Sequence, residues 1–139
     1  MPREPLQGEL TVKTGTRTEL VNVTRKVAEI LPAAFSGICH VFVPHTTAAV
    51  TINENADPDV GHDILAEIGR LVPDHNPVFR HAEGNSAAHV KAALLGSGVS
   101  IPVARGKLML GTWQGIFFCE FDGPRSRRIV VQLTPAPDS

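Results

Sequence analysis

The sequence is poor in the features that hold very small or secreted domains together. It has only two cysteines, Cys39 and Cys119, and each lies in an apolar run, GICHVFV and GIFFCEF. We therefore expect two reduced thiols in the core rather than a disulfide or a redox pair. A chain of 139 residues can bury a core that needs no disulfide or metal to stabilise it.

Long hydrophobic runs are also absent. No segment approaches the length of a transmembrane helix, about 20 residues, and the start, MPREPLQGEL, has no apolar core of signal-peptide length. The formal net charge is -1, so bulk electrostatics argues for neither nucleic acid nor an anionic membrane as a partner. These observations predict a cytoplasmic protein. The uniform composition predicts one domain over residues 1–139, with a core at about 8–133 and loose termini.

Hydrophobic periodicity mixes strands and helices without a regular βαβ repeat. Asp57 and Pro58 are typical of a helix N-cap and first helical position, and Asn85 and Gly96 are typical of the two ends of a second helix. The expected helices cover 22–35, 57–73 and 85–96, and the expected strands cover 8–14, 37–45, 48–54, 98–104, 107–113, 114–121 and 127–133. This order predicts a compact α+β domain, with helices packed on a mixed, mainly antiparallel sheet.

The stretch HTTAAVTINEN (45–55) has the pattern of a strand, but one of its faces is unusually polar. Ala49, Thr51 and Asn53 would share that face, and His45 and Thr47 would join it if Pro44 did not interrupt the strand. Such a face fills a core poorly. Two interpretations remain open, the wall of a pocket and an exposed sheet face.

Histidines and acids gather around this stretch. His81 and His89 lie eight residues apart, which matches no helical metal pair or zinc finger, so a metal site would need His45 as a distant third ligand. Ordinary, separately placed histidines are the alternative. Glu83 could act as a general base, and Asp63 could face a cleft or solvent. Glu120 ends an apolar strand, where a carboxylate needs a partner, and the run Arg125, Arg127 and Arg128 predicts an ion pair.

The same arginine run is a candidate anion site. Its forked guanidinium groups suit phosphate, and Arg80 and Lys91 could add to it, although a solvated turn would have the same sequence. The only tryptophan, Trp113, stands in LGTWQG as either a pocket wall or a core residue.

Three long motifs give the chain a resemblance to a known family. HTTAAVTINENADP, FRHAEGNSAAHVKAALLG and IPVARGKLMLGTWQGIFFCEFDGPRSRR resemble the YjbQ family over roughly residues 8–133. The resemblance implies a single α+β domain, a homotrimer and a secondary thiamine-phosphate synthase activity. Marker residues of the family fall on His45, Thr46, Asn53, Glu54, Asp57, Asp63, His81, Glu83, Asn85, His89, Gly111, Thr112, Trp113, Gln114 and Glu120.

The resulting hypothesis is a small-molecule enzyme that joins a pyrimidine diphosphate to a thiazole phosphate and releases pyrophosphate. Its alternatives are a metal-dependent hydrolase or lyase of a phosphorylated metabolite, and a non-catalytic trimer that binds a metal or such a metabolite. The sequence has neither an Asp-rich magnesium motif nor a glycine-rich phosphate loop, and its histidines suit zinc better than magnesium.

Each candidate residue then has an expected role. Asn53, Glu54, Asp63 and Glu83 are the expected catalytic residues, and His45, His81 and His89 are the expected ligands of a divalent metal, zinc or magnesium. Substrate binding falls to Thr46, Thr47, Arg80, Asn85, Lys91, Trp113, Gln114 and Arg125. The expected partners are a phosphorylated small molecule and further copies of the chain, with no nucleic acid and no membrane.

Overall fold

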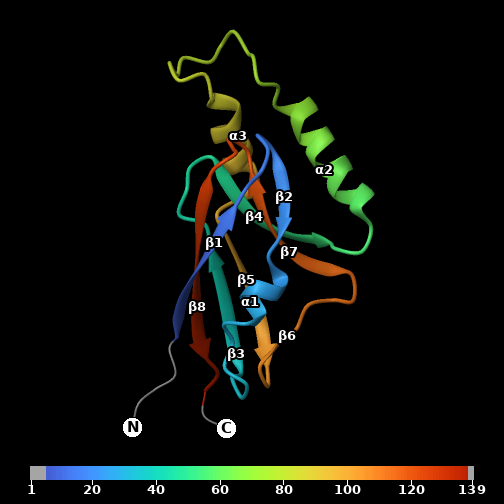
Figure 1. Cartoon of the computed structure of the whole chain (residues 1–139), viewed down its shortest axis with the longest axis vertical. Helices are drawn as coiled ribbons and strands as arrows, with labels where there is room; N and C mark the ends of the chain where they lie inside the picture. Colours follow the sequence, from blue (N-terminus) through green and yellow to red (C-terminus); the bar gives the residue numbers. More distant parts are fainter. Residues whose placement is uncertain (1–5, 138–139) are drawn as a thin grey trace.

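The computed structural model describes residues 6–137, which form two antiparallel sheets and three helices. The larger sheet has the strand order β1-β8-β3-β5-β6 and the smaller has the order β2-β7-β4 (Figure 1). The strands are β1 (Gln7–Lys13), β2 (Glu19–Asn22), β3 (Gly37–Phe42), β4 (Ala48–Glu54), β5 (Gly98–Ala104), β6 (Lys107–Leu108), β7 (Gln114–Glu120) and β8 (Ser126–Pro135). The helices are α1 (Thr24–Ala28), α2 (Pro58–Leu71) and α3 (Ser86–Leu95).

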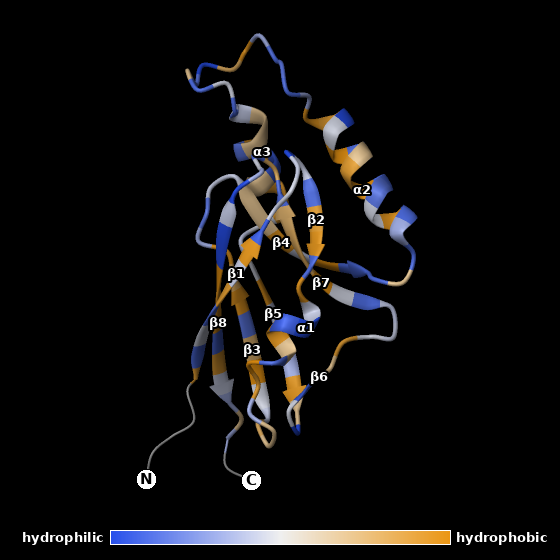
Figure 2. Cartoon of the chain, viewed as in Figure 1, coloured by the Kyte–Doolittle hydropathy of each residue, from blue (hydrophilic) through white to orange (hydrophobic). Residues whose placement is uncertain are grey.

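The main core is built from alternating residues of the strands. Val12, Val41 and Ile129 from the larger sheet join Ile116 and Phe118 of β7 in one buried cluster. Figure 2 shows apolar residues alternating with polar ones along these strands, and apolar residues also along α2. The α+β class predicted from the sequence is confirmed, but the expected single mixed sheet is two sheets, and every pairing within residues 6–137 is antiparallel.

A second buried cluster joins β4 and β7 to α3. Ala49 and Cys119 pack against Ala88 and Ala92 of the helix, with Phe121 beside them. Small residues on both sides allow α3 to lie close to the strands. The packing places α3, and the loop before it, beside the start of β4.

Helix α2 begins as the sequence predicts. Asp57 accepts a hydrogen bond from the Asp59 amide at 2.9 Å, and Pro58 is the first helical residue. Its apolar stripe is only partly covered: Leu65 and Ile68 pack against the second cluster, but within residues 6–137 no side chain of α2 is fully buried, and Leu71 is 61% exposed. Figure 1 shows α2 standing beside the sheets, joined to α3 by a long loop.

Three local predictions are wrong. The helix expected at 22–35 is only the short α1, because Ile30 and Leu31 turn back to the carbonyls three residues earlier and Pro32 disfavours helix at the residue before it. The strand expected at 107–113 pairs only at Lys107–Leu108. The tail is expected to be loose from residue 134, but residues 134 and 135 belong to β8. Residues 1–5 and 138–139, which are also expected to be loose, lie outside the described residues.

Candidate functional site

The loops at the start of β4 and before α3 meet in a pocket of about 310 Å³, the histidine pocket. Its lining residues are Thr46, Thr47, His81, Glu83, Asn85, His89, Asp122 and Arg125. All of these except Asp122 were candidates from the sequence. Residues from three separate parts of the chain therefore share one cavity, which periodicity alone could not show.

The two imidazoles of the pocket contact each other. The ring centroids of His81 and His89 lie 5.4 Å apart, with the planes at 86°, an edge-to-face arrangement. His81 Nε2 is 3.8 Å from Glu83 Oε2, and the Glu83 side chain is 74% exposed. Neither ring makes a hydrogen bond to another of residues 6–137. Both imidazoles are therefore free to bind a ligand.

Asp122 organises the opposite wall. Its Oδ2 accepts hydrogen bonds from Asn85 Nδ2 at 2.9 Å and from Arg125 Nη2 at 3.1 Å. Arg125 Nε also donates to the Asp122 carbonyl at 3.0 Å. This leaves Asn85 Oδ1 buried and without a partner among residues 6–137. Turning the amide over would place its oxygen against the carboxylate, so Asp122 fixes the orientation of Asn85.

The N-terminus of α3 opens at this pocket. Asn85 occupies the N-cap position, but its side chain makes no capping hydrogen bond because it is committed to Asp122. The first amides of the helix are therefore left without a side-chain partner, and the positive end of the helix dipole lies beside the two imidazoles.

Two further hollows adjoin the histidine pocket and share Thr46 with it. One, of about 530 Å³, includes His45, Arg125 and Arg127. The other, of about 380 Å³, includes His45 and His89. We call them the Thr46 hollows. All the candidates from His45 to Thr47 thus lie in one region with Arg125 and His89.

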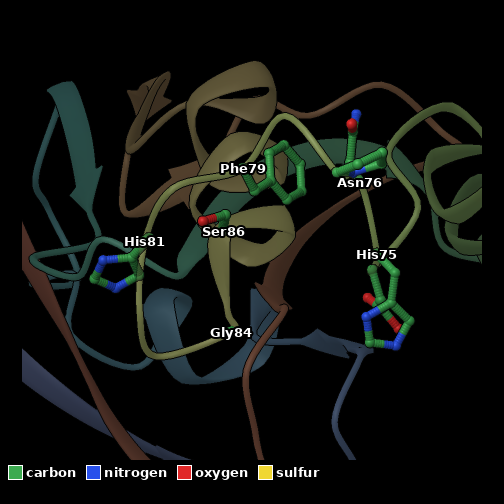
Figure 3. A pocket seen from close by; sticks show the side chains of 8 residues that line it. His75, Asn76, Phe79, His81, Gly84 and Ser86 are labelled. Carbon is green, nitrogen blue, oxygen red and sulfur yellow. The ribbon is translucent and has the colours of Figure 1, made fainter.

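A fourth cavity, the loop hollow, shares His81 with the histidine pocket. It measures about 440 Å³ and is lined by Asp74, His75, Asn76, Pro77, Phe79, His81, Gly84 and Ser86. Figure 3 shows His81 and His75 at opposite sides of it, with Phe79 and Ser86 between them. His81 therefore belongs to two cavities.

The remaining candidates lie elsewhere, so a single chain does not bring all the expected site residues into one cavity. Asn53 and Glu54 end β4, whereas Thr46 and Thr47 precede it, and a strand rises about 3.3 Å per residue. Gln114 lies on β7, where it is the cross-strand partner of Glu54. Trp113 is 63% exposed and belongs neither to the core nor to the histidine pocket. Asp63 lies on α2, exposed and paired with His62.

Two expected phosphate ligands are also displaced. Lys91 is buried, and its Nζ lies 3.9 Å from Asp74 Oδ1 and 6.0 Å from the centre of the Phe121 ring. Arg80 is exposed and lines none of the four cavities described above. The polar strand itself is also explained differently: Ala49 and Val50 are core residues, and the segment just before the strand lines the cavities.

A metal centre is not formed by these side chains. Within residues 6–137, no group of three or more His, Cys, Asp or Glu side chains is arranged to hold a metal ion. His81 and His89 are together, but His45 is turned to β8, where its Nε2 contacts the backbone of Arg128. Binding of a divalent metal stays a prediction from the sequence. Also within that range, no helix has the length and apolar character that a membrane crossing requires.

Comparison with known proteins identifies relatives over almost the whole chain. The family model described as "UPF0047 protein YjbQ-like" matches residues 8–136. The UPF0047 protein YugU of Bacillus subtilis is 46% identical over 126 residues, 89% of this chain and 96% of that protein. The UPF0047 protein MJ1081 of Methanocaldococcus jannaschii is 49% identical over 124 residues, covering 88% and 89% of the two chains.

Solved structures agree with the fold. An uncharacterised YjbQ/UPF0047 protein of Clostridium acetobutylicum superimposes with a TM-score of 0.86 at 45% identity, covering 91% of this chain and 98% of that chain. A conserved hypothetical protein of Thermus thermophilus gives a TM-score of 0.87 at 44% identity, covering 91% and 99%.

These names overturn the predicted function. Relatives such as YugU and the Escherichia coli YjbQ protein bear only the family designation, so the prediction of a thiamine-phosphate synthase is wrong, and neither of its two alternatives gains support. The resemblance that suggested it is nevertheless confirmed. By the match over residues 8–136 and by identities of 46% and 49% to proteins of nearly equal span, the chain belongs to the YjbQ-like UPF0047 family.

Proposed function

We propose that the histidine pocket binds a small phosphorylated molecule and that His81 and His89 exchange protons with it. The observation that carries the proposal is the pair of imidazoles in edge-to-face contact, without hydrogen bonds to other described residues, in a cavity that also contains Arg125. Imidazole is the side chain best suited to give and take protons near neutral pH.

The charges of the pocket favour binding of an anion only when a proton is bound to one of the two imidazoles. Asp122 and Glu83 oppose the single cation Arg125, and Asp122 already receives Arg125 at 3.1 Å. A proton on His81 or His89 cancels this excess of negative charge, and the uncapped start of α3 adds positive potential. A phosphate group would thus be held by Arg125 and by a protonated imidazole. That imidazole is positioned to act as a general acid toward the bound molecule.

Binding of methyl phosphate, followed by titration calorimetry, tests the proposal. We expect saturable binding by the wild-type protein and a loss of about tenfold or more in His89→Ala and Arg125→Ala, because each removes a charge-assisted hydrogen bond worth about 1.5–3 kcal/mol. His62→Ala is the matched control, since His62 is exposed on α2 and pairs with Asp63. Absent binding, or equal affinity in His89→Ala and wild type, would refute the proposal.

We also propose that copies of the chain associate, with the trimer expected from the family resemblance as the state. The support is the apolar surface that the single chain leaves uncovered. Large side chains that are at least 49% exposed are Phe42, Leu71, Val78, Leu94, Met109 and Trp113. Sedimentation equilibrium at micromolar concentration is the test, and a monomer there would exclude the trimer.

A further inference from the structure

The inference concerns His45, whose ring replaces a missing backbone partner of β8. The pairing of β3 with β8 ends at Phe42 opposite Val130, and two residues further it would set Pro44 opposite Arg128. Proline has no N–H and is poorly tolerated inside a sheet. The chain leaves the sheet there, and the His45 imidazole reaches back to Arg128.

The contacts of the ring bear on its tautomer. Nε2 lies 3.0 Å from the Arg128 amide nitrogen and 3.1 Å from the Arg128 carbonyl oxygen. In one tautomer Nε2 accepts from the amide, and in the other Nε2–H donates to the carbonyl. The amide always carries a proton and its contact is the shorter one, so we assign Nε2 as the acceptor and place the ring proton on Nδ1.

The surroundings keep the ring neutral. Burial lowers the pKa of His45, and the positive charge of Arg127 lowers it further, against smaller opposing effects of the Arg128 backbone and of Glu120. Arg127 is itself buried and paired with Glu120, so this charge is fixed in place. A second proton would also break the contact with the Arg128 amide.

The same ring lines two cavities. His45 lines both Thr46 hollows, one together with Arg125 and the other together with His89. Nδ1 has no hydrogen-bond partner among residues 6–137. We infer that Arg128 holds His45 in the Nδ1–H tautomer, and that this N–H is a fixed hydrogen-bond donor to an oxygen of the bound phosphorylated molecule. The inference rests on the proposed function for the identity of the ligand.

This role differs from those of the other two histidines. A neutral ring with one nitrogen accepting from the backbone and the other protonated has no free lone pair for a metal or for proton abstraction. His45 is therefore a specificity residue: its Nδ1–H donates to a ligand oxygen and disfavours a ligand that presents an N–H at the same point. The metal triad expected from the sequence would require the other tautomer, with Nε2–H donating to the Arg128 carbonyl and the Nδ1 lone pair facing the metal.

Nitrogen NMR of the protein labelled with ¹⁵N-histidine tests the inference directly. In the free protein at neutral pH we expect the protonated-nitrogen shift at Nδ1 of His45 and the unprotonated shift at Nε2. Addition of methyl phosphate should move the Nδ1–H proton resonance. The reverse tautomer, a doubly protonated ring, or an unmoved Nδ1–H at saturating methyl phosphate would overturn the inference.

Two substitutions by amide side chains distinguish the roles of the two ring nitrogens of His45. In His45→Gln the amide oxygen can still accept from Arg128, but the donor at the position of Nδ1 is lost. In His45→Asn the amide lies near the position of Nδ1, and the contact with Arg128 is lost. We expect His45→Gln to keep the wild-type melting temperature and bind methyl phosphate about tenfold more weakly, whereas His45→Asn melts lower and binds within about threefold of wild type.

The outcomes distinguish this inference from the proposed function. Wild-type affinity in His45→Gln, with weak binding in Arg125→Ala, would overturn the role of His45 and leave the histidine pocket intact. Failure of wild-type protein to bind methyl phosphate would overturn the proposed function and the ligand contact together. The tautomer is read from the free protein and stands or falls separately.

Discussion

Glu120 and Arg127 form an ion pair in the interior, with Arg127 Nε donating to Glu120 Oε1 at 2.9 Å. Glu120 is fully buried and Arg127 is 4% exposed. Thr14 and the Asp122 amide also donate to the carboxylate, at 2.8 and 2.9 Å, and Arg127 reaches Thr47 Oγ1 at 2.9 Å. The pair therefore fixes both Thr47 and the turn that carries Asp122 and Arg125 into the histidine pocket.

Acid should destabilise the protein through this pair. Burial would raise the pKa of Glu120, but the hydrogen bonds from Arg127, the Asp122 amide and Thr14 outweigh it and lower the pKa. A depressed carboxyl pKa contributes stability above the unfolded value, about 4.3, and that stability is lost as the pH falls through the folded value. Urea unfolding between pH 7 and pH 3 should show this loss.

Glu120→Gln should lower the free energy of unfolding at pH 7 by about 3–5 kcal/mol, because Arg127 is left buried without a counter-charge. Glu29→Gln is the matched control: its pair with Arg25 is exposed at 3.5 Å, and its removal should cost less than about 1 kcal/mol. Equal losses in the two variants would show that the interior pair has no special role.

Asp122→Ala should release the side chains of Asn85 and Arg125 from their fixed orientations in the histidine pocket. It removes the acceptor of Asn85 and of Arg125, and a buried amide left unpaired costs about 1–3 kcal/mol of stability. The side-chain Nε–H signal of Arg125 and the amide signals of Asn85 should lose their distinct positions in NMR spectra. Asp59→Ala, in an exposed part of α2, should leave these signals in place, and unchanged signals in Asp122→Ala would show that Asp122 does not orient them.

The two thiols should be unreactive in the folded protein. Burial raises the pKa of Cys39 to about 11 and that of Cys119 to about 12, and the thiolate is the reactive form. A disulfide-exchange reagent at pH 8 should label neither thiol on the timescale of minutes and both in urea. Rapid native labelling of either would contradict the buried positions that both the sequence and the structure assign to them.

The sequence predicts chemistry better than it predicts distance. His81, Glu83, Asn85 and His89 share a loop and one helix turn, and the family resemblance is what predicts that they belong to one site. The family resemblance predicts that Asn53 and Glu54 share a site with His45, but within one chain an extended strand carries its two ends about 20 Å apart over six residues. Adjacency in a strand is thus a poor guide to a shared pocket.

Asp122 shows what the sequence could not indicate. An aspartate before Gly-Pro is typical of a turn, and nothing in FDGPR reveals that its carboxylate meets Asn85, 37 residues earlier. The Glu120 ion pair, by contrast, was predicted, because a carboxylate in an apolar strand needs a cation and three arginines follow it. That prediction is confirmed, with Arg127 as the partner.

Two glycines should respond oppositely to alanine, one in the turn between β5 and β6 of the larger sheet and the other inside α2. Gly106 has φ +78, and a Cβ there would lie 2.4 Å from the Ala33 carbonyl oxygen, so Gly106→Ala combines backbone strain with a collision against main chain. Gly69 lies inside α2 with no atom within 4 Å of such a Cβ, and alanine there should stabilise the helix by about 0.5–1 kcal/mol.

We expect Gly106→Ala to lower the free energy of unfolding by about 2 kcal/mol or more, from strain of about 1–3 kcal/mol plus the displacement of residues around Ala33. Gly69→Ala should raise the free energy of unfolding, as measured in the same urea titration. A neutral Gly106→Ala would mean that the turn joining β5 to β6 can move away from Ala33, and a destabilising Gly69→Ala would mean that this face of α2 is covered when copies of the chain associate.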